Sequence, residues 1–119
     1  MHPLPTDQSG HRVIDGDRVT QAVAALARAG EIQERARQFA ILADPTRLTL
    51  LTAIKAAGPI SVSDLAAASG INDATVSQTL RYLRATESVT TQRDGRIIRY
   101  QLASTPIAAL VPGDAPPPG

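Results

Sequence analysis

The sequence contains no cysteine, a single lysine and very few aromatic residues. The lack of cysteine excludes disulfide bonds, thiolate metal sites and thiol-based redox sensing. Phe, Tyr and Trp together make up 3% of the 119 residues, so the core must be built from Leu, Ile and Val. Because a short chain buries only a small core, it often gains buried surface by dimerising.

Long apolar runs and catalytic patterns are also missing. No segment has the apolar length that a membrane-spanning helix needs, and the polar N-terminus with Pro3 and Pro5 is unlike a signal peptide. We therefore expect a cytoplasmic protein with no membrane partner. Both histidines, His2 and His11, lie in a segment predicted to be irregular, where a general base would not be held in place. We therefore expect that the protein is not an enzyme.

The total charge of the chain is nearly balanced, but the basic residues are unevenly distributed along the sequence. The net charge is +1, yet the stretch from Arg81 to Arg99 holds five arginines against Glu87 and Asp94. Such local clustering predicts one positively charged face, as in proteins that bind nucleic acid. Eleven of the twelve basic residues are arginine, which either favours bidentate recognition of phosphate or guanine or reflects a GC-rich genome.

The N-terminal third predicts a flexible arm followed by two helices. Residues 1–16 are polar and contain two Pro and two Gly, which is typical of a flexible arm. A first helix is expected to begin at Arg18 with Asp17 as its N-cap. Gly30 should break it, and a second helix should cover about 31–43.

A third helix has clear start and stop signals. Asp44 is a good N-cap, and Pro45 suits the first helical position, where its missing N–H costs nothing. Gly58 should end the helix. The apolar positions expected to face the core are Leu48, Leu51 and Ile54.

Two further helices have the layout of a helix-turn-helix. Ser61 with Asp64 three residues on resembles a capping box, and the short helix it begins should end before Gly70. Asn72 or Asp73 should cap the next helix, over about 73–86. Two helices joined by a tight glycine-containing turn are typical of a DNA-binding helix-turn-helix.

Residues 89–102 then change to a strand pattern. Asp94-Gly95 is a hairpin turn signal between two β-prone segments. A two-stranded ribbon directly after a helix-turn-helix is a wing. Its arginines are expected to stay in solvent: Arg93 at the tip, with Arg96 and Arg99.

A short last helix is expected over about 107–111, with Thr105 as its cap and Pro106 at its start, and residues 112–119 form a Pro/Gly tail predicted to be disordered. The predicted fold class is therefore mainly α with a small β-hairpin: a winged helix-turn-helix with the order α-α-α-α-α-β-β and a short C-terminal helix. Residues 17–111 form one DNA-binding and dimerisation domain.

The helix over 73–86 carries small polar side chains that add little to helix stability. A helix-turn-helix places the first residues of its second helix near base edges in the major groove. Glutamine can bond both edge atoms of adenine, and hydroxyls can donate or accept. The expected base or backbone contacts are Thr75, Ser77, Gln78 and Arg81. The alternative is a hydroxyl-rich helix that only faces water.

Three segments in order, "FAILADPTRLTLLTAI", "SVSDLAAASGINDATVSQTLRYLR" and "RDGRIIRYQL", resemble the ArsR/SmtB family of bacterial winged-helix repressors over about residues 39–103. The resemblance implies a homodimer that binds an inverted repeat in its own promoter region. It also implies release of the DNA when an inducer binds, commonly a metal ion.

The chain departs from the family at its usual metal sites. Where relatives often carry Cys-x-Cys at the start of the helix-turn-helix, this chain has Ser61-Val62-Ser63. Cysteine positions on the recognition helix align with Tyr82 and Thr86, and the Asp and His after the wing align with Ser104 and Pro106. A glycine usually found after the recognition helix is replaced by Glu87, which predicts an irregular helix end.

The remaining metal-ligand candidates lie in or next to the N-terminal arm: His2, His11 and Asp7, together with Asp15, Asp17 and the terminal amine. Nitrogen and oxygen ligands suit nickel, cobalt or zinc, and some family sensors recruit N-terminal residues. The arm could equally be a solvated tail, with an organic inducer or none.

In the family, the first and last helices usually build the dimer interface. Because the last helix is short here, the N-terminal helices should contribute more. The expected interface residues are Val19, Val23, Leu26, Phe39, Ile107 and Leu110.

The sequence thus predicts a homodimeric repressor that binds a double-stranded DNA operator. The alternative is a winged-helix protein-interaction module without DNA binding, which would have no need of Gln78, Arg81 and the wing arginines.

Overall fold

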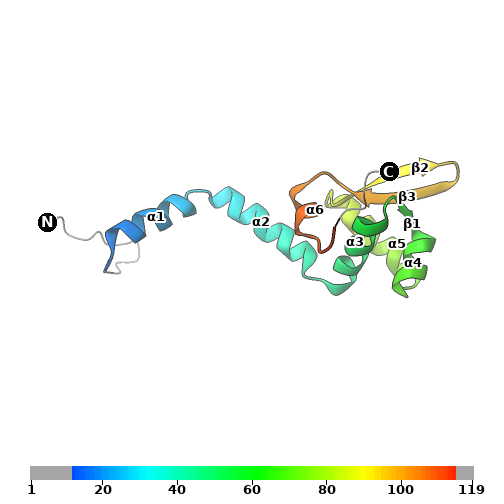
Figure 1. Cartoon of the computed structure of the whole chain (residues 1–119), viewed down its shortest axis with the longest axis horizontal. Helices are drawn as coiled ribbons and strands as arrows, with labels where there is room; N and C mark the ends of the chain where they lie inside the picture. Colours follow the sequence, from blue (N-terminus) through cyan, green and yellow to red (C-terminus); the bar gives the residue numbers. More distant parts are fainter. Residues whose placement is uncertain (1–11, 115–119) are drawn as a thin grey trace. The chain divides into compact units, whose positions relative to one another are not determined.

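The computed structural model describes residues 12–114, in the order α1-α2-α3-β1-α4-α5-β2-β3-α6 (Figure 1). The described part holds six helices and one small antiparallel sheet, which confirms the predicted fold class. The chain divides into two compact units, Met1–Arg37 and Gln38–Gly119. Among residues 12–114, no helix is both long enough and apolar enough to cross a membrane.

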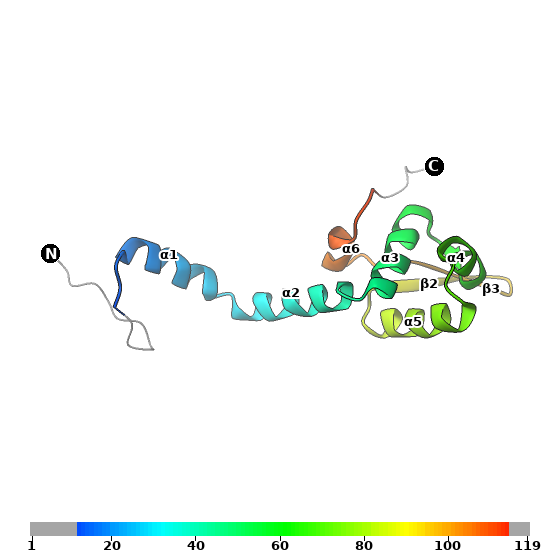
Figure 2. The ribbon, with the colours of Figure 1, turned by 90° about the horizontal axis from the view of Figure 1, so that it is seen from below.

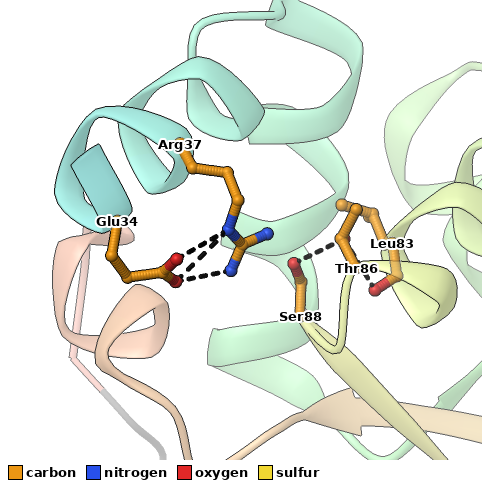
Figure 3. Close-up of polar contacts among 5 residues, drawn as sticks. All are labelled: Glu34, Arg37, Leu83, Thr86 and Ser88. Carbon is orange, nitrogen blue, oxygen red and sulfur yellow. Dashed lines mark hydrogen bonds and ion pairs between the residues drawn. The ribbon is translucent and has the colours of Figure 1, made fainter. Parts of the chain in front are cut away.

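The first unit contains α1 (Gly16–Leu26) and most of α2 (Ala29–Leu42). The predicted cap was wrong by two residues: Asp15, not Asp17, caps α1, its Oδ1 accepting from the backbone N of Arg18 at 3.2 Å. The break was also misplaced, because α1 ends at a cap on Ala27 and Gly30 lies inside the first turn of α2. On α2, Arg37 donates to both carboxylate oxygens of Glu34, one turn earlier (Figure 3).

The second unit begins with α3 (Pro45–Ala57), whose start and stop agree with the sequence. Asp44 Oδ2 accepts from the backbone N of Arg47 at 2.9 Å. Gly58 is needed for space, since a Cβ there would lie 2.6 Å from the carbonyl O of Ile54. The buried face differs slightly from expectation: Leu50, Leu51 and Ile54 are buried, while Leu48 is half-buried.

The helix-turn-helix is formed by α4 (Val62–Ser69) and α5 (Asp73–Ala85), seen side by side in Figure 2. Ser61 caps α4 by accepting from the backbone N of Asp64 at 3.2 Å. Gly70 follows with φ +72°, a left-handed conformation that glycine adopts without strain. Asn72 then caps α5.

The wing is the hairpin of β2 (Val89–Asp94) and β3 (Ile97–Leu102), paired from Val89↔Leu102 to Asp94↔Ile97. It extends past α3 and α6 (Figures 1 and 2). The turn is one residue later than predicted: Gly95 and Arg96 form it, with φ +62° at Gly95, so Arg96 rather than Arg93 lies at the tip. A short β1 (Ile60–Ser61), which the sequence did not indicate, pairs with β3.

The core of the second unit is aliphatic, as the composition requires. Helices α3, α4 and α5 and strand β2 contribute the residues Leu50, Leu51, Ile54, Leu65, Val76, Leu80, Leu83 and Val89. The short α6 (Pro106–Leu110) closes it with Ile107. Thr105 is the N-cap residue of α6, as predicted, but its side chain makes no capping hydrogen bond.

Candidate nucleic-acid interface

The recognition helix α5 presents a polar line to solvent because its apolar residues fix its rotation. Val76, Leu80 and Leu83 are fully buried against the core. Successive residues of a helix are rotated by about 100°, so positions 78 and 81 lie opposite this apolar stripe. Gln78 and Arg81 are indeed exposed, and no described residue makes a hydrogen bond or ion pair with either side chain.

The other two predicted contacts on α5 lie on its flanks. Ser77 is exposed, one residue before Gln78. Thr75 is half-buried, and its backbone N donates to Asn72 Oδ1 at 2.8 Å in the first turn. Of the four predicted contacts on α5, Ser77, Gln78 and Arg81 are therefore exposed and Thr75 is half-buried.

The three arginines of the wing differ in position: Arg93 and Arg99 lie on opposite faces of the hairpin, and Arg96 lies in its turn. Arg93 pairs across the strands with Ile98, whereas Arg99 pairs with Gln92 on the opposite face. Arg99 Nη1 donates to Asp94 Oδ2, so its charge is already balanced within the wing. Arg93 and Arg96 have no acidic partner in the described chain, which leaves them as the free cations of the wing.

A surface depression of about 480 Å³ separates the wing from the start of α4. Arg96 and Arg99 line one side, and Ser61 and Ser63 line the other. The depression places Arg96 and Arg99 of the wing beside the first turn of α4, the first helix of the helix-turn-helix.

The predicted dimer residues have different environments. Val23, Leu26 and Phe39 are exposed by 60%, 63% and 54%, and Val19 and Leu110 are half-buried. Ile107 is only 3% exposed and packs into the core of its own chain. The side chain of Ile107 therefore faces the core of its own chain and not solvent.

The positions Ser61, Tyr82 and Thr86, which the family resemblance aligns with cysteine ligands, have structural partners here. Ser61 caps α4, and the Tyr82 ring lies against the Arg47 guanidinium, 4.7 Å from its centroid to Cζ. Thr86 donates its hydroxyl to the Leu83 carbonyl at 3.1 Å (Figure 3). None of these side chains offers a thiolate or imidazole, so they do not fit the metal sites of such relatives.

Among residues 12–114, no group of three His, Asp or Glu side chains is close enough to hold a metal ion. The candidates His2, His11 and Asp7 lie outside the described residues, as do residues 1–11 of the predicted arm 1–16 and residues 115–119 of the predicted tail 112–119.

The end of α5 confirms the irregularity expected at Glu87, which has φ +60°. The backbone N of Ser88 donates to the Leu83 carbonyl at 2.8 Å, and that of Glu87 donates to Arg84 at 3.0 Å. This pair of bonds is the Schellman motif, whose left-handed position is usually glycine. The buried Ser88 hydroxyl is satisfied by Thr86 at 2.9 Å (Figure 3).

Sequence reasoning missed two cations that hold the unit together. Arg47 contacts α2 and α5, although it had no assigned role. Lys55 Nζ donates to the carbonyls of Val111 at 2.7 Å and Ala108 at 3.3 Å at the end of α6. The partners of Lys55 lie more than fifty residues away in the chain, so local sequence patterns could not reveal this contact. The one hint of a specific role was that Lys55 is the sole lysine of the sequence.

The chain is similar to known transcription regulators along most of its length. It is 36% identical over 94 residues to a transcriptional repressor SmtB homolog from Synechocystis, an alignment covering 79% of this chain and 70% of the relative. It is 44% identical over 70 residues to the HTH-type transcriptional regulator NmtR from Mycobacterium tuberculosis, covering 59% of this chain and 58% of the relative. The chain thus spans little more than half of the length of NmtR.

The fold is shared with a solved DNA-binding domain. The homodimeric winged helix-turn-helix DNA-binding domain (fragment 1–100) of Mb0332 from Mycobacterium bovis, a possible ArsR-family transcriptional regulator, is 30% identical with a TM-score of 0.60, covering 71% of this chain and 77% of that one. A model of the MarR family matches residues 44–97, from the cap of α3 into β3. These relatives regulate transcription and are not enzymes. The chain belongs to the ArsR/SmtB family of winged-helix transcriptional repressors.

Proposed function

We propose that this chain is a homodimeric repressor that binds an inverted-repeat operator and releases it when an inducer binds. One observation carries the proposal: Gln78 and Arg81 on α5 are exposed, and Arg93 and Arg96 on the wing are exposed and have no acidic partner in the described chain. Helix side chains suit the major groove, and basic wing residues suit phosphates or the minor groove. A protein with this role acts in the cytoplasm, where the chromosome is.

The base contacts are assigned to α5. Gln78 would bond the two edge atoms of adenine, and Arg81 would bond guanine or a phosphate. Ser77 and Thr75 would contact base edges or the backbone. On the wing, Arg93 and Arg96 would neutralise phosphates, and Arg99 would do so only by leaving Asp94.

Dimerisation is proposed through apolar residues of both units. In the first unit these are Val23 and Leu26, which are exposed, and Val19, which is half-buried; in the second unit they are the exposed Phe39 and the half-buried Leu110. The Mb0332 domain, which shares the fold, is homodimeric. Two copies related by a two-fold axis would match the two halves of an inverted repeat.

The inducer is proposed to be either a small non-metal ligand or a nickel, cobalt or zinc ion held by the N-terminal arm through His2, His11 and Asp7. The lack of cysteine and the structural partners of Ser61, Tyr82 and Thr86 favour the non-metal inducer over the usual thiolate sites.

Fluorescence anisotropy tests the proposal on labelled DNA from upstream of the chain's own gene, against an unrelated duplex of equal length. The repressor should prefer the upstream DNA by at least about a thousandfold at physiological salt. The titration is repeated with chelator and then with nickel, cobalt and zinc in turn. Release by one metal, abolished by His2→Ala or His11→Ala, would identify the arm as the sensor.

The alternative function is a protein-interaction module that has lost DNA binding. Equal, weak affinity for both duplexes would favour it. Tight binding to the upstream DNA that no metal changes would support the repressor function and would direct the search for inducers to organic ligands.

A further inference from the structure

The side chain of Arg47 contacts both the end of α2 and the recognition helix. Its Nε donates to the Ile41 carbonyl at 2.8 Å, and its Nη2 donates to the Ala40 carbonyl at 3.0 Å. The guanidinium carbon lies 4.7 Å from the centroid of the Tyr82 ring on α5. Because Arg47 is itself in the first turn of α3, with its backbone N bonded to Asp44, one side chain joins three helices.

The chemistry of arginine suits both contacts at once. The last carbonyls of a helix lack N–H partners within that helix, and a cation there interacts favourably with the helix dipole. The guanidinium donates in its own plane and presents a flat face for stacking on an aromatic ring. The in-plane donors of Arg47 therefore bind α2 while its face lies over Tyr82.

Tyr82 lies on the flank of α5, between the buried stripe and the polar line. It is 43% exposed, and Gln78 precedes it by about one helical turn. The buried Val76, Leu80 and Leu83 determine which face of α5 packs on the core, and the contact between Arg47 and Tyr82 adds a directional constraint outside the core. A rotation would move Tyr82 off the guanidinium and would turn Gln78 by the same angle.

We propose that Arg47 is a positioning residue for DNA recognition, which holds Tyr82 and thereby sets the rotation of α5 that aims Gln78 and Arg81 at the bases. The inference rests on the proposed DNA-binding role of α5. It assigns no DNA contact to Arg47, and it gives Tyr82 a role through its ring and not its hydroxyl, for which the structure shows no hydrogen-bond partner within residues 12–114.

The test uses four single variants of the full chain, Arg47→Met, Arg47→Lys, Tyr82→Leu and Tyr82→Phe, and the double variant of Arg47→Met with Tyr82→Leu. The first readout is the ratio of affinities for the upstream duplex and for an unrelated duplex, measured well below the melting temperature of every variant. Removing the stacked pair should lower this ratio about fivefold, as for a cation–π contact of moderate strength. Arg47→Met, Tyr82→Leu and the double variant should all show the same loss.

Two conservative variants separate positioning from charge and from direct contact. Tyr82→Phe keeps the ring and should keep the wild-type ratio. Arg47→Lys keeps the charge but lacks the planar fork, so it should lower the ratio while leaving the salt dependence of binding unchanged. A second readout, a double-mutant cycle on unfolding without DNA, should show that Arg47 and Tyr82 are coupled in the free protein.

The outcomes are distinguishable. A wild-type ratio in Arg47→Met and Tyr82→Leu would overturn the positioning role. Equal losses in Tyr82→Phe and Tyr82→Leu would also overturn it, because the hydroxyl would then contact DNA directly. If the wild type itself showed no preference for upstream DNA, the proposed function and the positioning role would fail together, while coupling in the unfolding cycle would still establish the contact.

Discussion

Arg99 and Asp94 form an ion pair along one face of the wing, Nη1 to Oδ2, next to the turn at Gly95 and Arg96. The carboxylate is largely exposed, at 72%, while the arginine is 37% exposed. An exposed pair of this kind adds little to stability. Its consequence is electrostatic: one of the three wing arginines has its charge balanced before any DNA arrives.

Replacing Asp94 should therefore strengthen DNA binding. Asp94→Asn removes the carboxylate and frees Arg99 for a phosphate, so affinity should rise and the slope of log affinity against log salt should steepen by about one. Anisotropy titrations over a salt series measure both. Asp17→Asn, on the exposed first turn of α1 in the other unit, makes the same change in net charge without changing the wing itself. An equal effect of Asp17→Asn would mean that net charge, not the wing, controls affinity.

Removing a proposed DNA-binding arginine should have the opposite effect. Arg81→Ala and Arg96→Ala should each weaken binding to the upstream duplex, and an arginine that contacts phosphate should also make the salt slope shallower by about one. Arg28→Ala, just before α2, is the matched control for the loss of one charge. If neither Arg81→Ala nor Arg96→Ala changes affinity more than Arg28→Ala does, α5 and the wing are not the DNA-binding surface.

The left-handed Glu87 should be a site at which stability can be gained. A residue with a Cβ at φ +60° is strained by roughly 1–2 kcal/mol. Glu87→Gly should raise the free energy of unfolding by about 1 kcal/mol, whereas Glu87→Ala should not, because alanine keeps the Cβ. Urea unfolding measures the difference. A glycine variant no more stable than the alanine variant would show that the local backbone carries no such strain.

The exposed apolar residues of α1 predict a charge-sensitive dimer. Val23→Glu places a carboxylate on the proposed interface and should shift the protein toward monomer in sedimentation equilibrium. Gln21→Glu adds the same charge to α1 at another exposed position and should leave the assembly unchanged. Both variants behaving as wild type would remove α1 from the interface.

Local signals explain why most of the fold was predictable. Asp44, Ser61 and Asn72 accept the capping bonds expected of them, and Gly70 takes the left-handed conformation after α4. These features depend on neighbours within four residues, which the sequence displays directly. The apolar spacing of Val76, Leu80 and Leu83 likewise fixed the face of α5.

The errors lie where a second nearby residue competes or where distant segments meet. Asp15 and Asp17 are both good caps, and Gly95 begins the wing turn one residue after Asp94. Strand β1 exists only because β3 pairs with it, forty residues later in the chain. The contacts of Arg47 with Tyr82, Lys55 with α6 and Arg99 with Asp94 depend on tertiary placement, so composition and periodicity could not predict them.

The central claim, that α5 binds base edges in the major groove, is tested most directly with modified DNA. Upstream duplexes are prepared with single purines replaced by their 7-deaza analogues, which lack the N7 acceptor exposed only in the major groove. The account predicts that some replacements weaken wild-type binding by about 1–3 kcal/mol each, and that Gln78→Ala or Arg81→Ala is insensitive to the replacement at the base its side chain would contact. If every 7-deaza duplex binds as tightly as the unmodified one, α5 does not contact purines in the major groove, and the account is wrong.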